Sequence, residues 1–167
     1  MEKSLSHITH TFGAVYDSES RVLILGTMPS PKSREQGFYY AHPQNRFWSV
    51  LAKLYGEETP MGTEDRKDFA LRHKIALWDV LSECDIYGAS DSSIRNPVPN
   101  DIAKLLSKTD IKAIFTTGAT ATKFYEKYIE PKTGLKAIAL PSTSPANARC
   151  SFEKLLAEYA KIKEYTE

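Results

Sequence analysis

The chain has 167 residues, which is the size of one domain, and we expect that domain to span residues 1–167. Its formal net charge is +1. Its two cysteines, Cys84 and Cys150, lie far apart, which argues against a disulfide scaffold or a four-cysteine metal site and favours a reducing cytoplasm. No run approaches the ~20 apolar residues of a membrane span, and the N-terminus lacks the apolar stretch of a signal peptide, so we expect no membrane partner.

Short apolar runs alternate with helical patterns along the chain. Residues 21–27 (RVLILGT) form a leucine-rich and β-branched run that predicts a buried strand, and a loop rich in proline, serine and glycine follows. Residues 43–55 carry apolar side chains at helical spacing, with Pro43 suited to the first turn and Gly56 to the C-terminal stop. A second, charged helix is predicted over residues 63–73.

The second half of the chain continues this alternation. Strands are predicted at residues 75–80, 111–118 and 135–142, and helices at residues 101–107, 119–129 and 151–165. Residues 85–100 have the composition of a long polar loop, whose last residue, Asn100, is placed to cap the next helix. Strands that alternate with helices predict an α/β fold, here a three-layer α/β/α sandwich around a central, mostly parallel sheet of four strands.

In such folds ligands bind beyond the carboxyl ends of the strands, so the segments that leave the strands should converge on one cleft. Gly26 permits close approach of the backbone, but the turn at 26–30 lacks the lysine of a P-loop and is also typical of an ordinary turn. Asp79 ends a strand inside an apolar run and is either a cap or a site residue. Within residues 141–147, hydroxyl groups could hold phosphates, or Ser144 could cap a short helix.

The segment Phe38–Trp48, FYYAHPQNRFW, combines aromatic and polar side chains around the start of a predicted helix. Asn45 could hold a water or a ligand carbonyl there, or it could make a cap-like hydrogen bond to the backbone. His42 could act as a general acid, or it could cap or pack. At least one of Tyr39 and Tyr40 could stay exposed and stack on a flat ring.

Four segments occur in the order GTMPS, GFYYAHPQNRFW, LWDVL and LPSTSPANA. Together they resemble the uracil-DNA glycosylase superfamily, most closely its hypoxanthine-DNA (deoxyinosine) glycosylase branch, and they share segments with the mismatch-specific uracil/thymine DNA glycosylases. Met28 stands where the mismatch branch has a catalytic asparagine, Leu140 where many relatives have histidine or asparagine, and Asp79 where an asparagine often recognises uracil. These departures fit the hypoxanthine branch better, since catalysis there is attributed to the asparagine that is Asn45 here.

The resemblance implies a monofunctional DNA glycosylase that flips a deaminated base, hypoxanthine, out of duplex DNA and hydrolyses its N-glycosidic bond. It implies that Asn45 positions the attacking water and that Tyr40 stacks on the base. Asp79 would accept a ring N–H, and the backbone around Gly26 would bind the base through the amides of Thr27 and Met28. DNA contacts are expected from Ser30, Ser142, Thr143, Ser144, Asn147 and Arg149. No metal or other cofactor is required, and the expected partner of this monomer is double-stranded DNA.

Three other interpretations stay open. The same site could serve a uracil or thymine mismatch glycosylase. Met28 could mark a non-catalytic member that only binds nucleic acid, and the small net charge neither indicates nor excludes such binding. An unrelated α/β protein with a packed aromatic helix would leave the ordered set of segments unexplained.

Overall fold

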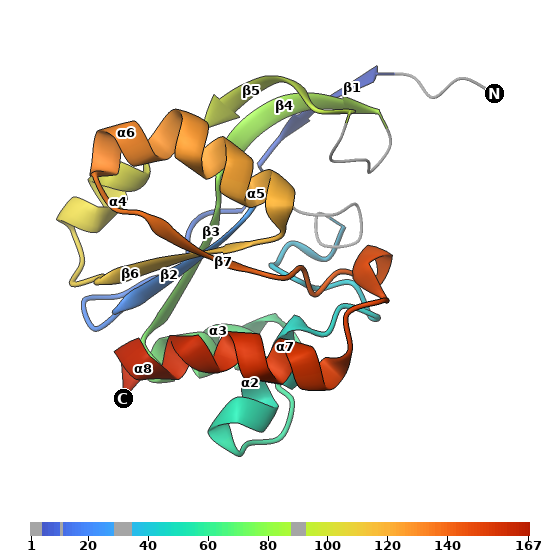
Figure 1. Cartoon of the computed structure of the whole chain (residues 1–167), viewed down its shortest axis with the longest axis vertical. Helices are drawn as coiled ribbons and strands as arrows, with labels where there is room; N and C mark the ends of the chain where they lie inside the picture. The colour runs from blue at the N-terminus through green and yellow to red at the C-terminus, as the bar shows by residue number, and fades with distance from the viewer. Residues whose placement is uncertain (1–4, 11, 29–34, 88–92) are drawn as a thin grey trace.

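The central layer of the fold is a sheet of four parallel strands in the order β3-β2-β6-β7. The computed structural model describes residues 5–10, 12–28, 35–87 and 93–167. Within them the sheet consists of β2 (Val22–Gly26), β3 (Ile75–Asp79), β6 (Ala113–Thr117) and β7 (Ala137–Leu140) (Figure 1). Helices cover both faces, so the predicted three-layer α/β sandwich with a four-stranded central sheet is confirmed.

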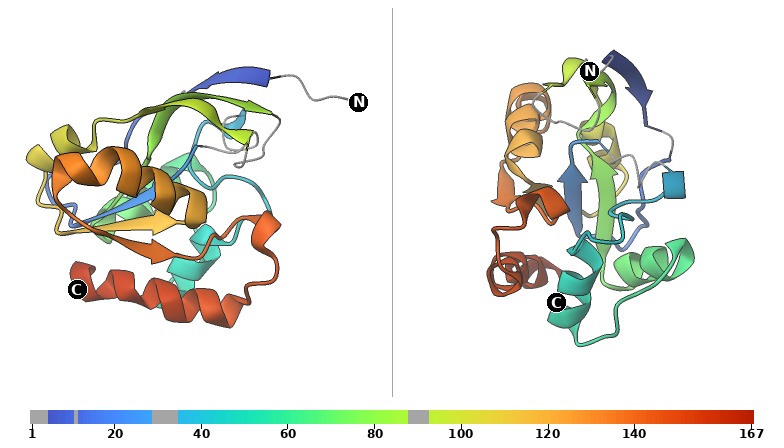
Figure 2. Two further views of the ribbon diagram at one scale, coloured as in Figure 1. Left: turned by 45° about the horizontal axis from the view of Figure 1, so that its top comes forward. Right: turned by 90° about the vertical axis from the view of Figure 1, so that its right-hand side faces the viewer.

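One face of the sheet is covered by helices from both halves of the chain (Figures 1 and 2). These are α2 (Phe47–Tyr55), α3 (Thr63–Arg72), α7 (Phe152–Tyr159) and, after a 3₁₀ turn, α8 (Lys163–Thr166). Side chains alternate along β2, so Val22 and Ile24 face this layer, whereas Leu23 and Leu25 face the other. A strand buried on both faces explains the unbroken apolar run seen in the sequence.

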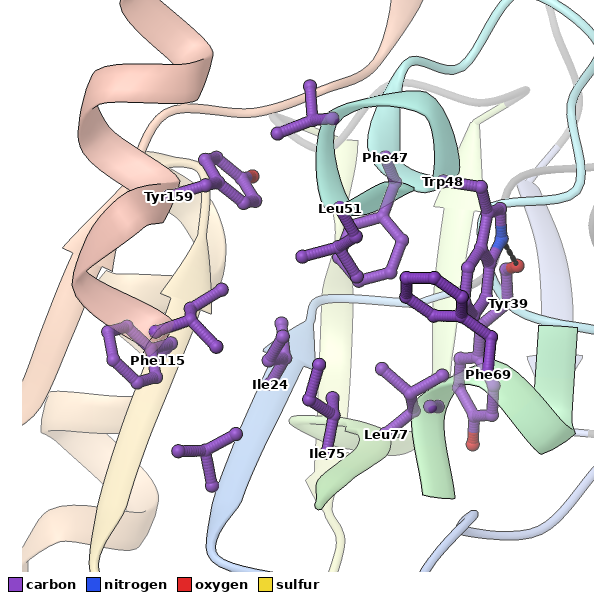
Figure 3. Packing of buried hydrophobic residues seen from close by; sticks show 14 of the residues in the cluster. Ile24, Tyr39, Phe47, Trp48, Leu51, Phe69, Ile75, Leu77, Phe115 and Tyr159 are labelled. Carbon is purple, nitrogen blue, oxygen red and sulfur yellow. Dashed lines mark hydrogen bonds between the residues drawn. The ribbon is translucent and has the colours of Figure 1, made fainter. Parts of the chain in front are cut away.

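The core beneath α2 is rich in aromatic rings (Figure 3). Phe47 and Trp48, at the start of α2, lie edge to face with their ring centroids 5.1 Å apart. The indole N–H of Trp48 donates to the backbone oxygen of Tyr39 at 3.1 Å, which ties the preceding segment to the helix. These residues are buried, as expected for core side chains.

The opposite face carries α4 (Ile102–Ser107), α5 (Ala119–Phe124) and α6 (Glu130–Thr133). A π-helical turn joins α5 to α6, so the helix predicted over 119–129 continues to Thr133. A second, antiparallel sheet in the order β1-β4-β5 packs on this side, formed by β1 (Leu5–Thr9), β4 (Leu81–Tyr87) and β5 (Arg95–Pro99). No helix of the described chain is both long and apolar enough to cross a membrane.

The prediction of a polar loop at residues 85–100 is wrong, because the described part of this range belongs largely to β4 and β5. Strand β1 was not predicted. In β4 only Leu81, Cys84 and Ile86 turn inward, and the register shifts twice against β5, so the apolar alternation is irregular. The prolines of β5 are tolerated because an edge strand leaves one row of backbone groups unpaired.

Two helix starts also differ from the predictions. The helix predicted to begin at Pro43 begins at Phe47, after the N-cap residue Arg46, and the side chain of Asn45 accepts the backbone N–H of Phe47. The cap of α4 is Asp101, whose carboxylate accepts from the backbone N–H of Lys104, and Asn100 instead donates to the backbone oxygen of Asp79.

Candidate functional site

The carboxyl ends of the parallel strands meet at one edge of the sheet, at the right of Figure 1 and towards the viewer in the right-hand view of Figure 2. Gly26 ends β2, Asp79 ends β3 and Thr117 ends β6, and the segment that leaves β7 contacts the residues that precede α2. These strand ends lie together as expected, although the chain after Asp79 continues at once into β4, and the cleft between them stays a prediction.

Gly26 lies among three polar side chains from distant parts of the chain. A Cβ atom on Gly26 would lie 2.7 Å from Oδ1 of Asp79, 3.4 Å from Oη of Tyr40 and 3.6 Å from Oγ1 of Thr117. The first distance is shorter than any ordinary contact, so a side chain here would displace Asp79. The bare backbone of Gly26 therefore allows these groups to share one site.

Asp79 is almost completely buried and is hydrogen-bonded to a residue that the sequence patterns did not single out. Its Oδ2 lies 2.7 Å from Nε2 of His10, and each side chain is 5% exposed. The pKa of Asp79 lies above its ordinary value, because burial raises it by more than the bond to His10 and a hydrogen bond from the Gly26 backbone lower it. Within the described residues no third ligand joins such a pair to form a metal site.

Tyr40 adopts an unusual backbone conformation, with a φ of 53°, in the left-handed region that few residues other than glycine enter. Its ring stacks on Phe47 with centroids 3.8 Å apart, and its hydroxyl lies 3.3 Å from Oγ1 of Thr117. Burial raises the pKa of Tyr40, so the phenol stays neutral. Tyr39 is buried and donates its hydroxyl to the backbone oxygen of Gly13, so only Tyr40 keeps partial exposure.

The Asn45 side chain is oriented by two donors. Its Oδ1 accepts the backbone N–H of Phe47 at 2.9 Å and the hydroxyl of Thr143 at 2.8 Å. Because a backbone N–H can only donate, the oxygen and nitrogen of this amide cannot be interchanged. Its NH₂ group has no partner among the described residues, so Asn45 uses its oxygen to hold the start of α2 and presents free donors.

Thr143, an expected DNA contact, is 1% exposed, and its hydroxyl donates to Asn45. Its hydroxyl hydrogen is therefore not available for a phosphate. Arg46 strengthens the same junction, since its guanidinium donates to the backbone oxygens of Cys150 at 2.6 Å and Asn147 at 3.1 Å. The segment before α2 and the loop after β7 therefore form one unit.

The other expected DNA contacts differ in whether their polar groups already have hydrogen-bond partners within the protein. The hydroxyl oxygens of Ser142 and Ser144 each accept a backbone N–H two residues ahead, which leaves each hydroxyl hydrogen available. Asn147 donates its amide to the backbone oxygen of Ser142, so it supports the loop. Arg149 is exposed and has no partner among the described residues. Ser30 lies outside the described residues.

The loop after β2 offers backbone groups more than side chains. Thr27 is 6% exposed, and the side chain of Met28 packs against the core on the α4–α5 side of the sheet. The backbone N–H groups of both residues lack a partner in the described part of the chain. His42 accepts the backbone N–H of Gln44 on Nδ1, which favours its capping role.

Comparison with known proteins relates this site to a family. The family model of the uracil DNA glycosylase superfamily matches residues 13–165. The chain belongs to the uracil DNA glycosylase superfamily. The resemblance carried by the four sequence segments is therefore confirmed, and the unrelated α/β protein is excluded.

Relatives within the superfamily cover most of the chain. A protein named hypoxanthine DNA glycosylase from Methanosarcina acetivorans is 34% identical over 146 residues, which cover 86% of this chain and 91% of the relative. A protein of the same name from Methanosarcina barkeri is 31% identical over 140 residues, which cover 83% and 87%. The solution NMR structure of a candidate uracil DNA glycosylase from M. acetivorans matches with a TM-score of 0.82 and 29% identity, over 98% of this chain and 100% of that one.

Proposed function

We propose that this chain is a monofunctional DNA glycosylase that releases hypoxanthine from duplex DNA by hydrolysing the N-glycosidic bond of a flipped deoxyinosine. The observation that carries the proposal is the buried Asp79 carboxyl group at the strand edge, flanked by the bare backbone of Gly26 and the ring of Tyr40. The names of the two Methanosarcina relatives support it independently.

Base recognition depends on the direction of one hydrogen bond. Hypoxanthine carries a hydrogen on N1, where adenine has a lone pair, so the carboxylate of Asp79 accepts from the first and repels the second. Tyr40, whose ring lies on Phe47, stacks on the base with its other face. The backbone amides of Thr27 and Met28 donate to the base carbonyl.

Cleavage of the N-glycosidic bond leaves positive charge on the sugar and negative charge on the departing base. The NH₂ group of Asn45 donates to one lone pair of a water, and the other lone pair attacks C1′. The base leaves as an anion with the electrons of the broken bond. The water gives up one proton to solvent as the new C–O bond forms, and the anionic base takes up one proton from solvent, so that neutral hypoxanthine is released. Because the free end of Asn45 only donates, it positions the water without removing its proton.

DNA binding is assigned to the residues that remain free to reach a phosphate. Ser142 and Ser144 donate their hydroxyl hydrogens, and Arg149 supplies charge. Ser30 stays an expected DNA contact outside the described residues, whereas Asn147 acts by holding the loop. We also propose that the enzyme is a monomer that works in the cytoplasm without a metal or other cofactor.

Excision of uracil, or of thymine from mismatches, is the second candidate, because the N3–H of these bases would satisfy Asp79 in the same way. Duplexes that contain inosine, uracil, a G·T mismatch or xanthine separate the two, since the proposal expects inosine to be cut fastest. Binding to these duplexes without alkali-labile sites would instead indicate a non-catalytic member.

Replacing Asn45 tests the proposed mechanism. We expect Asn45→Ala to lower single-turnover release of hypoxanthine, assayed in EDTA, by at least ~100-fold, because it removes a preorganised donor. It also removes the acceptor for the first backbone N–H of α2, at a cost of about 1 kcal/mol in the free energy of unfolding.

The matched variant is Asn45→Ser, which keeps a capping oxygen but has no amide N–H. It should melt within a few degrees of the wild type and still lose excision. Full activity in either variant would contradict the assignment of Asn45.

A further inference from the structure

The buried pair of His10 and Asp79 has no role in the mechanism proposed so far. His10 directly follows β1, in the small sheet, whereas Asp79 ends β3 of the central sheet. The backbone N–H of His10 donates to the backbone oxygen of Ser82 at 2.7 Å, which fixes the position of His10 against β4. The contact between Nε2 and Oδ2, at 2.7 Å, is therefore held from both sides.

The second ring nitrogen of His10 indicates which partner carries the proton. Its Nδ1 is buried and has no hydrogen-bond partner among the described residues, with the rings of Phe12 and Tyr39 beside the imidazole. A protonated Asp79 would donate to Nε2 and leave an N–H on Nδ1 buried without an acceptor. A doubly protonated His10 would leave the same orphan donor. Buried orphan donors are rarer than buried acceptors without a donor.

One arrangement avoids an orphan donor. The hydrogen then lies on Nε2 and is donated to an ionised Asp79, while Nδ1 keeps only a lone pair. The other titratable groups that couple to Asp79 are Tyr39 and Tyr40, and burial raises the pKa of each, so both stay neutral. Gly26 contributes a backbone hydrogen bond, and Thr117, the neighbour from β6, does not titrate.

We propose that His10 is a positioning residue that holds Asp79 as an ionised group, which can only accept a hydrogen bond from the base. This property of Asp79 lets the site distinguish hypoxanthine from adenine, an inference that rests on the proposed function. His10 does not touch the base. It acts by binding Oδ2, which leaves Oδ1, the oxygen next to Gly26, for the N1–H of hypoxanthine. A protonated Asp79 would present a donor as well, and a donor fits the lone pair on N1 of adenine.

The pH dependence of excision tests this role. Burial raises the pKa of Asp79 and the bond to His10 lowers it, so loss of His10 must raise it further. His10→Phe keeps an aromatic ring beside Phe12 and Tyr39 but has no N–H. We expect the acidic limb of kcat/KM for an inosine duplex to move up by at least ~1 pH unit, with activity regained at high pH.

His10→Gln is the rescuing variant, because its amide can donate to Asp79. Its acidic limb should lie within about half a unit of that of the wild type. If His10→Phe does not fold, His10→Asn takes its place, since its shorter amide does not span the contact. An acidic limb unmoved in a folded Phe or Asn variant would overturn the proposal.

A titration of the free protein separates this inference from the proposed function. The carboxyl carbon of Asp79 is followed by NMR from acid to neutral pH in the wild type and in His10→Phe, with Asp79→Asn to assign the signal. An upward shift of the Asp79 pKa in the variant supports the role of His10 even if inosine proves not to be the substrate. An identical pKa in both proteins overturns it, whatever base is excised.

Discussion

Asn45 uses the two ends of one amide for different purposes. Its oxygen accepts from Phe47 and Thr143, and its nitrogen has no partner among the described residues, which leaves it for the proposed water. Caps at helix starts and side chains in active sites are often treated as alternatives, but a planar amide can do both because its acceptor and donors point in different directions. We therefore expect the hydroxyl of Thr143 to act by orienting Asn45 rather than by contacting a phosphate.

Replacing Thr143 by valine removes this support with little change in shape. We expect Thr143→Val to lower single-turnover excision by ~10-fold or more, because a loosely held donor is poorly placed for the water. Loss of the hydrogen bond should cost about 1–2 kcal/mol in the free energy of unfolding.

Thr143→Ser keeps the hydroxyl and is the matched control, so its rate should stay near that of the wild type. Single-turnover kinetics and urea denaturation provide both measurements. A valine variant as fast as the serine variant would remove Thr143 from the mechanism.

At the scale of the element, the end of each strand determines which side chains share the site. Strand β2 lies between β3 and β6, so its last residue, Gly26, is enclosed by the last residues of both neighbours. Asp79 and Thr117 approach it from the two sides, and Tyr40 approaches from the segment before α2. The sheet can bring these groups together only if the middle strand ends without a side chain.

Gly26→Ala adds one methyl group where the sheet has no space. The new Cβ would lie 2.7 Å from Oδ1 of Asp79, so the carboxyl group must move. Since a displacement of ~1 Å in a recognition group can cost ~100-fold in rate, we expect a loss of that order in kcat/KM for an inosine duplex.

The control is Gly13→Ala, because a Cβ there would meet no atom within 4 Å. It should retain the activity and the melting temperature of the wild type. Unchanged activity in Gly26→Ala would show that Asp79 does not need its present position.

At the scale of the whole molecule, a formal net charge of +1 gives no general attraction for DNA. Affinity must then come from a few well-placed groups at the site edge. Arg149 is the exposed cation of the loop that Arg46 holds beside Asn45. We therefore expect the charge of Arg149 to contact a phosphate that flanks the flipped base.

Removing this charge should change the salt dependence of binding. We expect Arg149→Ala to weaken duplex binding several-fold and to reduce the slope of log K against log salt by about 0.9, the release expected for one phosphate contact. Fluorescence anisotropy over a range of salt concentrations measures both quantities. Lys53→Ala, an exposed cation near the far end of α2, should leave the slope unchanged. Equal slopes for the two variants would exclude Arg149 from the interface.

Local sequence patterns were sufficient for the central sheet and most helices, because burial on both faces gives a strand a continuous apolar run and gives a covering helix a regular apolar spacing. The small sheet was missed, because its strands are short, bulged and exposed on one side. The order of the four segments from GTMPS to LPSTSPANA, through its resemblance to the superfamily, also pointed to Asn45, Tyr40 and Asp79.

By itself, then, the sequence determined the α/β layers, the superfamily and the residues most closely tied to its motifs. Only the tertiary structure decided how those residues are held. His10 meets Asp79 across 69 positions, and Thr143 meets Asn45 across 98, so neither contact leaves a periodic trace in the chain. A single polar residue gives no local sign of its partner, because the partner is chosen by the packing of two sheets and a loop.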